Sequence, residues 1–339
     1  MRESESSGQG PATPRDTLDT GHWTLDPSPR PWPRWLGIGA LCLFVFFFAL
    51  WQRSAKLHTS PFHPDESRWI DRATYLEELR HPLGSFWQDR YLIRGQPPMG
   101  SYVIGLALLL QGKDLATNGP WDFQYGFETA ITWNVSHGNM PTFDNLIAAR
   151  QGNMVLGALT CVMLVLIVGM LVNWAGGLVA GLFMAVHPLH IYLSTLAVSD
   201  AMFTTFVAFS VLAVIWLARK PTWGRSLLLA LALGMGAATK LSPLLIAVGW
   251  TPYAFVLFLD PWLRSRERIG RAWKLVSRRE FGTERQLGWK LLVQSGLVGA
   301  FFIVVYPFLW YDPIGRTRII FDFRKSEMDS QARVWPDAA

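Results

Sequence analysis

The chain has 339 residues, half of them hydrophobic and only 17% charged, and it includes 17 Trp and 21 Phe. Soluble domains rarely have this composition, which therefore argues against a water-soluble protein. The formal net charge of +6 would suit a nucleic-acid partner. However, the basic residues gather beside an apolar segment, where anionic lipid headgroups attract them. The sequence thus predicts an all-α, multi-pass membrane protein with no nucleic-acid partner.

The N-terminal segment, residues 1–33, is rich in Ser, Pro, Gly and charged residues. It has too few apolar side chains to offset the entropy lost on ordering, so we predict a disordered cytoplasmic tail. The next segment, Trp35 to Trp51, is apolar and follows Arg30 and Arg34 without a small-residue cleavage site. This pattern predicts a retained first membrane span and not a removed signal peptide.

Residues 52–150 are predicted to form a large first external loop that contains interfacial helices. Within this loop, the apolar run from Pro97 to Leu110 is only about 14 residues long, which is short for a membrane span. We expect it to form a helix that starts at its proline pair and lies along the membrane interface. The loop also contains the triplet Asn134-Val-Ser136, a sugar-acceptor sequence that is common by chance.

Further apolar runs bring the expected number of membrane spans to about seven. The predicted spans after the first are Gly152 to Val172, Gly177 to Thr195, Ala201 to Ala218, Ser226 to Thr239, Pro243 to Leu259 and Leu291 to Leu309. With a cytoplasmic N-terminus, the basic stretch at residues 260–290 becomes a cytoplasmic loop, as the positive-inside tendency requires. Residues 314–339 then form a short external tail.

Charged residues in or beside membrane spans are candidates for function, because hydrocarbon disfavours them. They are the pair Asp65 and Glu66 after the first span, Arg150 at the start of the second, and Asp200 and Lys240 between later spans. The predicted topology places all of them at the outer face of the membrane. Cations together with a carboxylate base suit a substrate that carries a phosphate group.

Each of these residues also has a purely structural interpretation. Asp65 could be the N-cap of a helix, and Asp200 could cap the span that follows it. Arg150 and Lys240 could extend their charged groups from span ends to the membrane surface. The predicted location of all these charges at one membrane face favours function over these alternatives.

Six sequence motifs resemble, in order, those of a known enzyme family. They are His63-Pro-Asp-Glu66, Gln96-Pro-Pro-Met99, Ala149-Arg-Gln-Gly-Asn-Met-Val-Leu-Gly157, His187-Pro-Leu-His-Ile-Tyr-Leu-Ser194 running on to Asp200, Ala238-Thr-Lys-Leu-Ser242 and Tyr306-Pro-Phe-Leu-Trp-Tyr-Asp-Pro313. The pattern is similar to the N-terminal membrane module of the polyprenol-phosphate-sugar-dependent glycosyltransferases. This family includes the protein O-mannosyltransferases and the bacterial lipid A aminoarabinose transferase. The resemblance implies a GT-C-type bundle over residues 34–313.

The resemblance also implies roles for individual residues. Asp65 would be the base that takes a proton from the acceptor hydroxyl, with support from Glu66, and the anomeric carbon would be inverted. Asp200 matches a second acidic position near the acceptor. The lipid phosphate would be held by Arg150 and Lys240. Pro97 and Pro98 would start the interfacial helix that walls the site.

The sequence departs from the family pattern at Gln96, where members often have Lys or His, and Arg94 could supply the missing contact. The implied donor is a polyprenyl-phosphate-linked sugar, and the acceptor is a protein, a lipid or a glycan. A divalent metal stays possible, with no ligand assigned. Because family members usually continue beyond the seventh span, the chain is expected to be truncated relative to them. The absence of a transit-type or retention signal favours a bacterial plasma membrane, with the endoplasmic reticulum membrane as the alternative in a eukaryotic host.

Two other functions remain open. Charged groups within a helical bundle could bind an ion or solute in a secondary transporter, although such proteins usually contain internal repeats and place these groups near the bilayer midplane. The chain could also be a non-catalytic or truncated glycosyltransferase subunit. Replacing Asp65 with Asn would distinguish a non-catalytic subunit, which should tolerate the change, from an enzyme.

Overall fold

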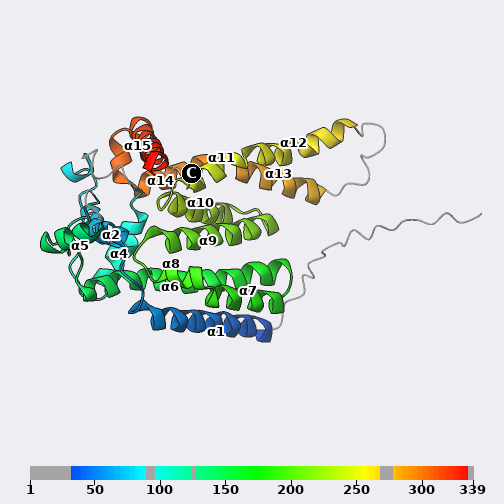
Figure 1. Cartoon of the computed structure of the whole chain (residues 1–339). Helices are drawn as coiled ribbons and strands as arrows, with labels where there is room; N and C mark the ends of the chain where they lie inside the picture. The colour runs from blue at the N-terminus through cyan, green and yellow to red at the C-terminus, as the bar shows by residue number, and fades with distance from the viewer. Residues whose placement is uncertain (1–31, 89–95, 124–126, 268–277, 335–339) are drawn as a thin grey trace, which may run out of the picture.

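The computed structural model is a bundle of long helices with shorter helices gathered at one end (Figure 1). It describes residues 32–88, 96–123, 127–267 and 278–334, and all the regular elements in these ranges are helices. The predicted all-α membrane fold is therefore confirmed. Residues 1–31, most of the predicted N-terminal tail, lie outside the described part.

Among the described residues, five helical segments are long and apolar enough to cross a membrane: Leu36–Leu57, Phe143–Leu171, Ser199–Arg219, Ser242–Leu259 and Arg285–Val305. A sixth crossing is counted if the bent pair α7 (Trp174–Val186) and α8 (Pro188–Ser194) forms one span. The sequence predicted about seven. The difference comes from α10 (Trp223–Ala237), which has 15 residues and is shorter than a typical span.

The predicted span Gly177 to Thr195 is broken at a proline. Pro188 is the first residue of α8, and the axes of α7 and α8 meet at 63°. A proline cannot donate a backbone hydrogen bond and clashes with the preceding turn, so α7 ends and a new helix starts.

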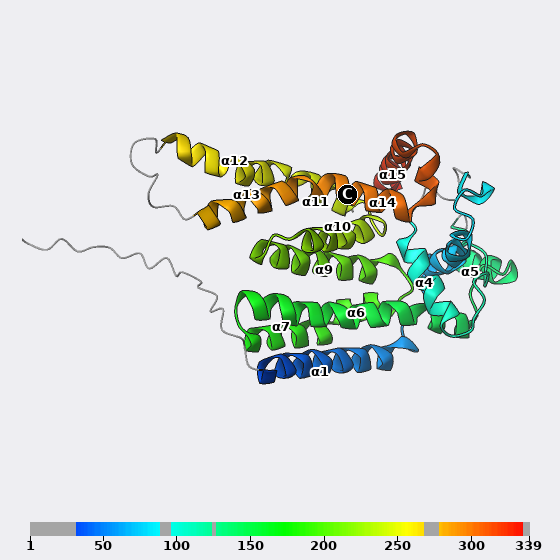
Figure 2. The same ribbon diagram turned by 180° about the vertical axis from the view of Figure 1, so that it is seen from behind.

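The remaining bundle helices pack side by side in both views (Figures 1 and 2). Their bounds are α1 Trp32–Leu57, α6 Phe143–Leu171, α9 Ser199–Arg219, α11 Ser242–Gly249, α12 Thr251–Glu267, α13 Arg278–Leu292 and α14 Gln294–Val305. α12 and α13 approach closely at Gly288, where a Cβ atom would lie 2.6 Å from the Phe258 nitrogen. The stretch predicted as a basic loop, residues 260–290, is therefore helical at both ends, and residues 268–277 lie outside the described part.

The short helices at the other end are called the cap here. They are α2 Pro64–Asp71, η1 Arg72–Thr74, α3 Tyr75–Glu78, η2 Ser85–Gln88, α4 Met99–Leu109 and α5 Phe127–Ser136. Their aromatic side chains join those of the bundle in one apolar cluster, which includes Trp69, Trp87, Tyr306 and Phe308. The cap is thus fixed to the bundle by a continuous core.

Asn134, the candidate sugar acceptor in α5, has no exposed surface. Its amide nitrogen donates to the carbonyl oxygens of Asp122 and Ala130, and its amide oxygen accepts from the Asp122 backbone N–H at 2.7 Å. These contacts give Asn134 a role in holding the cap together. The buried amide is not placed to accept a sugar.

The chain after the bundle forms η3 (Pro307–Tyr311) and α15 (Pro313–Val334). The sequence predicted only a short tail over most of α15. In both views α15 lies beside α14, at the same end of the bundle as the cap (Figures 1 and 2). It thereby adds a helix to the region where the candidate site residues lie.

Candidate functional site

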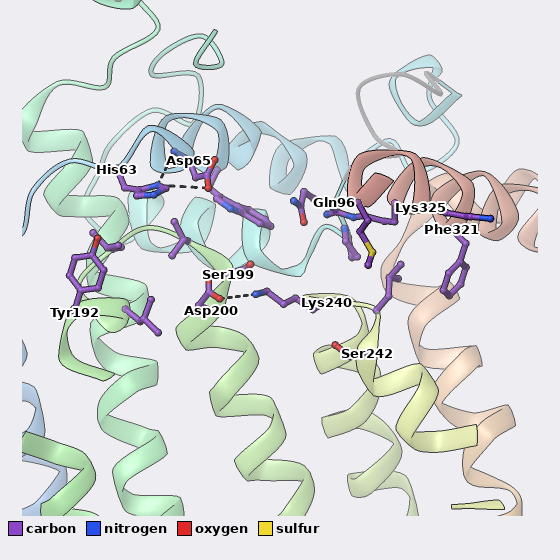
Figure 3. A pocket seen from close by; sticks show the side chains of 18 of the residues that line it. His63, Asp65, Gln96, Tyr192, Ser199, Asp200, Lys240, Ser242, Phe321 and Lys325 are labelled. Atoms are coloured by element: carbon purple, nitrogen blue, oxygen red, sulfur yellow. Dashed lines mark hydrogen bonds and ion pairs between the residues drawn. The ribbon is translucent and has the colours of Figure 1, made fainter. Parts of the chain in front are cut away.

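A cavity of about 850 Å³ opens where the cap, the bundle and α15 meet (Figure 3). Four parts of the chain line it: the start of α2 with Gln96 and Pro97, the segment from α8 to α9, the turn between α10 and α11, and one face of α15. Segments that are far apart in the sequence therefore line the same cavity.

The structure brings five of the predicted site residues to this cavity: Asp65, Gln96, Pro97, Asp200 and Lys240. The others lie elsewhere. Pro98 is the buried N-cap residue of α4. Glu66 and Arg150 are buried beside the cavity without lining it. Arg94 lies outside the described residues.

Asp65 stands in the first turn of α2 with its side chain 53% exposed. It is not the N-cap residue that the structural interpretation suggested. His63 is the N-cap, and its Nδ1 atom accepts the Asp65 backbone N–H at 3.2 Å. Because Nδ1 acts as an acceptor there, it does not also donate to the Asp65 carboxylate 3.8 Å away. The carboxylate is left accessible from the cavity.

Glu66, the next residue, is completely buried and pairs with Arg150. Nε of Arg150 donates to Oε1 of Glu66 and Nη2 donates to Oε2, both at 2.7 Å. The remaining Arg150 N–H groups donate to the carbonyl oxygens of Leu57, Ser60 and Pro61 at 3.0–3.1 Å. A guanidinium has five N–H donors, and all are used.

This geometry does not suit the phosphate-binding role that the resemblance gave to Arg150. A phosphate would have to displace partners that Arg150 already holds in a site without solvent access. Nor does Arg150 stand at the start of its span, because α6 begins two turns earlier and is capped by Thr142. The sequence could not reveal the pairing, since Glu66 lies 84 positions away in the chain.

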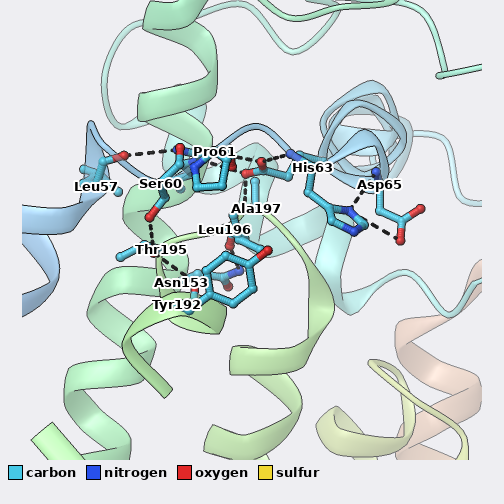
Figure 4. Close-up of polar contacts among 12 residues, drawn as sticks. Leu57, Ser60, Pro61, His63, Asp65, Asn153, Tyr192, Thr195, Leu196 and Ala197 are labelled. Atoms are coloured by element: carbon cyan, nitrogen blue, oxygen red, sulfur yellow. Dashed lines mark hydrogen bonds and ion pairs between the residues drawn. The ribbon is translucent and has the colours of Figure 1, made fainter. Parts of the chain in front are cut away.

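Glu66 holds two cavity segments together. Besides Arg150, its carboxylate accepts the backbone N–H of Ala197 at 2.7 Å and that of His63 at 2.9 Å. The first belongs to the segment that leads to Asp200, and the second caps the helix that carries Asp65 (Figure 4). Glu66 therefore connects the segments that carry Asp65 and Asp200.

Asn153, on α6, supports the segment before α9. It belongs to the motif from Ala149 to Gly157, but the sequence did not predict a role for it. Its amide nitrogen donates to the carbonyl oxygen of Leu196 at 2.5 Å (Figure 4). The same nitrogen donates to the carbonyl oxygen of Val198 at 2.6 Å. Ser60 and Thr195 add a hydrogen bond between their hydroxyls at 2.8 Å. The loop before α9 is thus held from both sides.

Arg53, missed in the sequence, ties α1 to α8. It is fully buried, its Nε donates to the Ser194 hydroxyl at 2.8 Å, and its Nη2 lies 2.6 Å from Nδ1 of His190. Gly157 of α6 makes room for this contact, because a Cβ atom there would lie 2.8 Å from the Arg53 Nε. The sequence signal that could have identified Arg53 is its position as a charged residue near the end of the first span.

Asp200 and Lys240 form an ion pair at the cavity with a distance of 2.7 Å. Asp200 lies in the first turn of α9 but does not cap it, because Val198 is the N-cap residue. Lys240 belongs to the turn after α10, which accepts a hydrogen bond from Met99 through the Ala238 carbonyl at 2.9 Å. The two side chains are 41% and 39% exposed, so solvent and ligands can reach the pair.

Comparison with protein families matches residues 84–312 to the dolichyl-phosphate-mannose-protein mannosyltransferases. The match covers more than half of the chain. The chain belongs to this family. No curated protein and no solved structure matches it. The resemblance stated from the motifs is therefore confirmed, and membership indicates a membrane glycosyltransferase.

The range matched to the mannosyltransferase family contains Gln96, Asp200 and Lys240 but begins after Asp65 and Glu66. It ends at residue 312, immediately before α15 begins at Pro313. The cavity is thus built partly from the matched range and partly from helices on either side of it. Asp65 and α15 both lie outside the matched range.

A metal site finds no support in the described residues. No group of three or more His, Cys, Asp and Glu side chains in that part of the chain is arranged to hold a metal ion. Asp65 and Asp200 both line the cavity, but the cation that contacts Asp200 is the Lys240 ammonium.

Proposed function

We propose that this chain is an integral-membrane glycosyltransferase that transfers mannose from dolichyl-phosphate-mannose, or a related polyprenyl-phosphate donor, to an acceptor hydroxyl. The reaction takes place at the outer face of the membrane, with the N-terminus in the cytoplasm. One observation carries the proposal: an accessible carboxylate, Asp65, shares a cavity of about 850 Å³ with the cation Lys240. Family membership supports the donor class.

Asp65 is the general base in this proposal. The acceptor oxygen attacks the anomeric carbon and passes its proton to the Asp65 carboxylate, while the bond from that carbon to the phosphate oxygen breaks. The bonding electron pair leaves with the phosphate, and attack from the opposite side inverts the anomeric carbon. A positioned carboxylate of this kind accelerates such reactions by about 10²- to 10⁴-fold.

Lys240 is the cation that meets the lipid phosphate. Its ion pair with Asp200 is exposed, and an exposed pair contributes at most about 1 kcal/mol, so a phosphate oxygen can compete for the ammonium. Asp200 then orients Lys240 and contacts the acceptor. Charge that develops on the departing phosphate strengthens the contact with Lys240 as the reaction proceeds.

The buried pair of Glu66 and Arg150 has a positioning role in the proposal. Its hydrogen bonds hold the start of α2 and the segment before α9, so the distance between Asp65 and Asp200 is set by a rigid connection. Gln96 and Pro97 complete the wall beside Asp65. The family description names a protein, so the proposed acceptor is a side-chain hydroxyl of a protein.

The test is release of dolichyl phosphate by the purified protein in nanodiscs supplied with dolichyl-phosphate-mannose and a peptide rich in serine and threonine. Wild type should release the lipid phosphate, and Asp65→Asn should slow release at least about 100-fold. Asp114→Asn, an exposed carboxylate outside the cavity, is the matched control and should keep the wild-type rate. Equal rates for Asp65→Asn and wild type would remove Asp65 as the base, and no release by wild type would overturn the proposed activity.

A further inference from the structure

α15 is firmly attached to the cap at its start. Arg316 is 6% exposed, and its Nη1 donates to the carbonyl oxygens of Trp87 at 2.9 Å and Phe308 at 2.7 Å. Its guanidinium also lies over the rings of Phe308 and Tyr311, at 4.7 and 4.6 Å from their centroids. A buried arginine held by two carbonyls and two rings fixes the direction in which α15 leaves the bundle.

One face of α15 borders the cavity. Phe321, Arg324, Lys325 and Met328 follow the i, i+3, i+4, i+7 spacing of a single helix face, and all of them line the cavity. Arg324 forms an ion pair with Glu327, one turn further on. Lys325 has no hydrogen bond or ion pair with any residue in the described part of the chain. Figure 3 shows Lys325 and Phe321 on the α15 side and Lys240 on the bundle side.

The charges that line the cavity without α15 do not favour a phosphate. They are the carboxylates of Asp65 and Asp200 and the single ammonium of Lys240, which Asp200 already contacts. The face of α15 adds Lys325, Arg324, whose partner Glu327 does not line the cavity, and one carboxylate, Asp329. The formal sum over these groups changes from one negative charge to zero. The second source of positive charge in the cavity is therefore α15.

The reaction proposed above demands such a source. A sugar–phosphate–lipid diester carries one negative charge, whereas the released phosphate monoester carries about −1.5 to −2 near neutral pH. Negative charge thus accumulates on the phosphate while the bond to the sugar breaks. A second cation in the cavity would offset the part of the negative charge on the phosphate that Lys240 alone does not neutralise.

We propose that Arg324 and Lys325 of α15 bind the phosphate of the lipid donor and of the released lipid, opposite Lys240. Arg150 is excluded from this task because all of its N–H groups are used. The ligand identity rests on the proposed function. The binding step itself requires only a membrane-anchored phosphate monoester.

Binding of dolichyl phosphate to the full chain in nanodiscs tests this inference, with dolichol and phosphatidic acid as comparison lipids. Arg324→Gln and Lys325→Gln should each weaken dolichyl phosphate binding about tenfold, and the double variant more. Dolichol binding should not change, and Lys325→Arg should bind as wild type does. Arg318→Gln is the matched control, because Arg318 lies on the same helix, has a side chain 83% exposed and does not line the cavity.

Each outcome decides the inference. Unchanged binding in the double Arg324→Gln, Lys325→Gln variant overturns it, as does an equal loss in Arg318→Gln. Equal binding and equal loss for phosphatidic acid would show a general headgroup site and overturn the donor assignment. Weaker binding in the variants, together with a wild type that binds dolichyl phosphate but never releases it from the sugar donor, would support the role of α15 and overturn the proposed transfer. Absence of binding by wild type would overturn both.

Discussion

Two ion pairs near the cavity have the same N–O distance, 2.7 Å, and opposite surroundings. The side chains of Arg150 and Glu66 are 1% and 0% exposed, whereas those of Lys240 and Asp200 are 39% and 41% exposed. In the buried pair every Arg150 donor has a partner, and in the exposed pair the ammonium can exchange partners. Equal distance therefore does not mean equal function: the first pair builds the site and the second is available to a substrate.

The energetic consequences differ in the same way. Removing one partner of a buried pair leaves a charge without solvent or counter-ion, which costs about 3–5 kcal/mol. An exposed pair contributes between about 0 and 1 kcal/mol. The contrast therefore separates two carboxylates that the sequence named together as site residues, Glu66 and Asp200.

The largest expected effect follows from breaking the buried pair. Arg150→Met should lower the free energy of unfolding by about 3–5 kcal/mol, because Glu66 is left buried and charged. Thermal unfolding in detergent measures the loss. The double variant Arg150→Met, Glu66→Gln removes both charges and should recover most of it. A single variant as stable as wild type would show that the pair does not hold the fold.

Breaking the exposed pair should affect the ligand more than the fold. We expect Lys240→Gln to change the unfolding free energy by less than about 1 kcal/mol and to weaken dolichyl phosphate binding about tenfold. Lys56→Gln, an exposed lysine outside the cavity, serves as the control. Loss of folding in Lys240→Gln, or normal binding by it, would contradict the distinction between the pairs.

A third carboxylate, Asp71 on α2, is partly buried and has no ion pair in the described part of the chain. It therefore differs from both Glu66 and Asp200. Burial raises its pKa to about 6, against the opposing effect of the neighbouring Arg72 and Arg68 guanidinium groups. The unfolded value is near 3.9, so the folded protein holds this proton more tightly. The contribution of this carboxyl to stability should therefore be fully present below about pH 4 and be lost, by about 3 kcal/mol, as pH rises through 6. Asp71→Asn should remove this part of the pH dependence. A wild-type profile identical to that of the variant would contradict the assignment.

The sequence predicted the all-α membrane class because apolar runs of this length are typical of membrane-spanning helices. It also named Asp65, Asp200 and Lys240, which the structure places at one cavity. The predicted number of spans, about seven, is larger than the five or six found among the described residues. The proline that breaks the helix pair at Pro188 was visible, but α10 was taken as a full span although its helix has only 15 residues.

Contacts between distant segments could not be predicted. An arginine can bind either a phosphate or a buried carboxylate, so the residue type of Arg150 did not decide between them. Only the fold shows that its guanidinium binds Glu66 and three carbonyl oxygens. The region of α15 has no long apolar run, so it was predicted as a tail. The spacing of Phe321, Arg324, Lys325 and Met328 was a signal for a helix face, but not for the cavity that this face borders.

The most direct test of this division of roles is dolichyl phosphate binding to two folded variants measured side by side. The double variant Arg150→Met, Glu66→Gln removes the buried charges, and Lys240→Gln removes the exposed cation. We expect the double variant to bind within about twofold of wild type and Lys240→Gln to lose about tenfold. A folded double variant that loses binding as severely as Lys240→Gln would contradict the account, because it would make Arg150 a ligand of the phosphate.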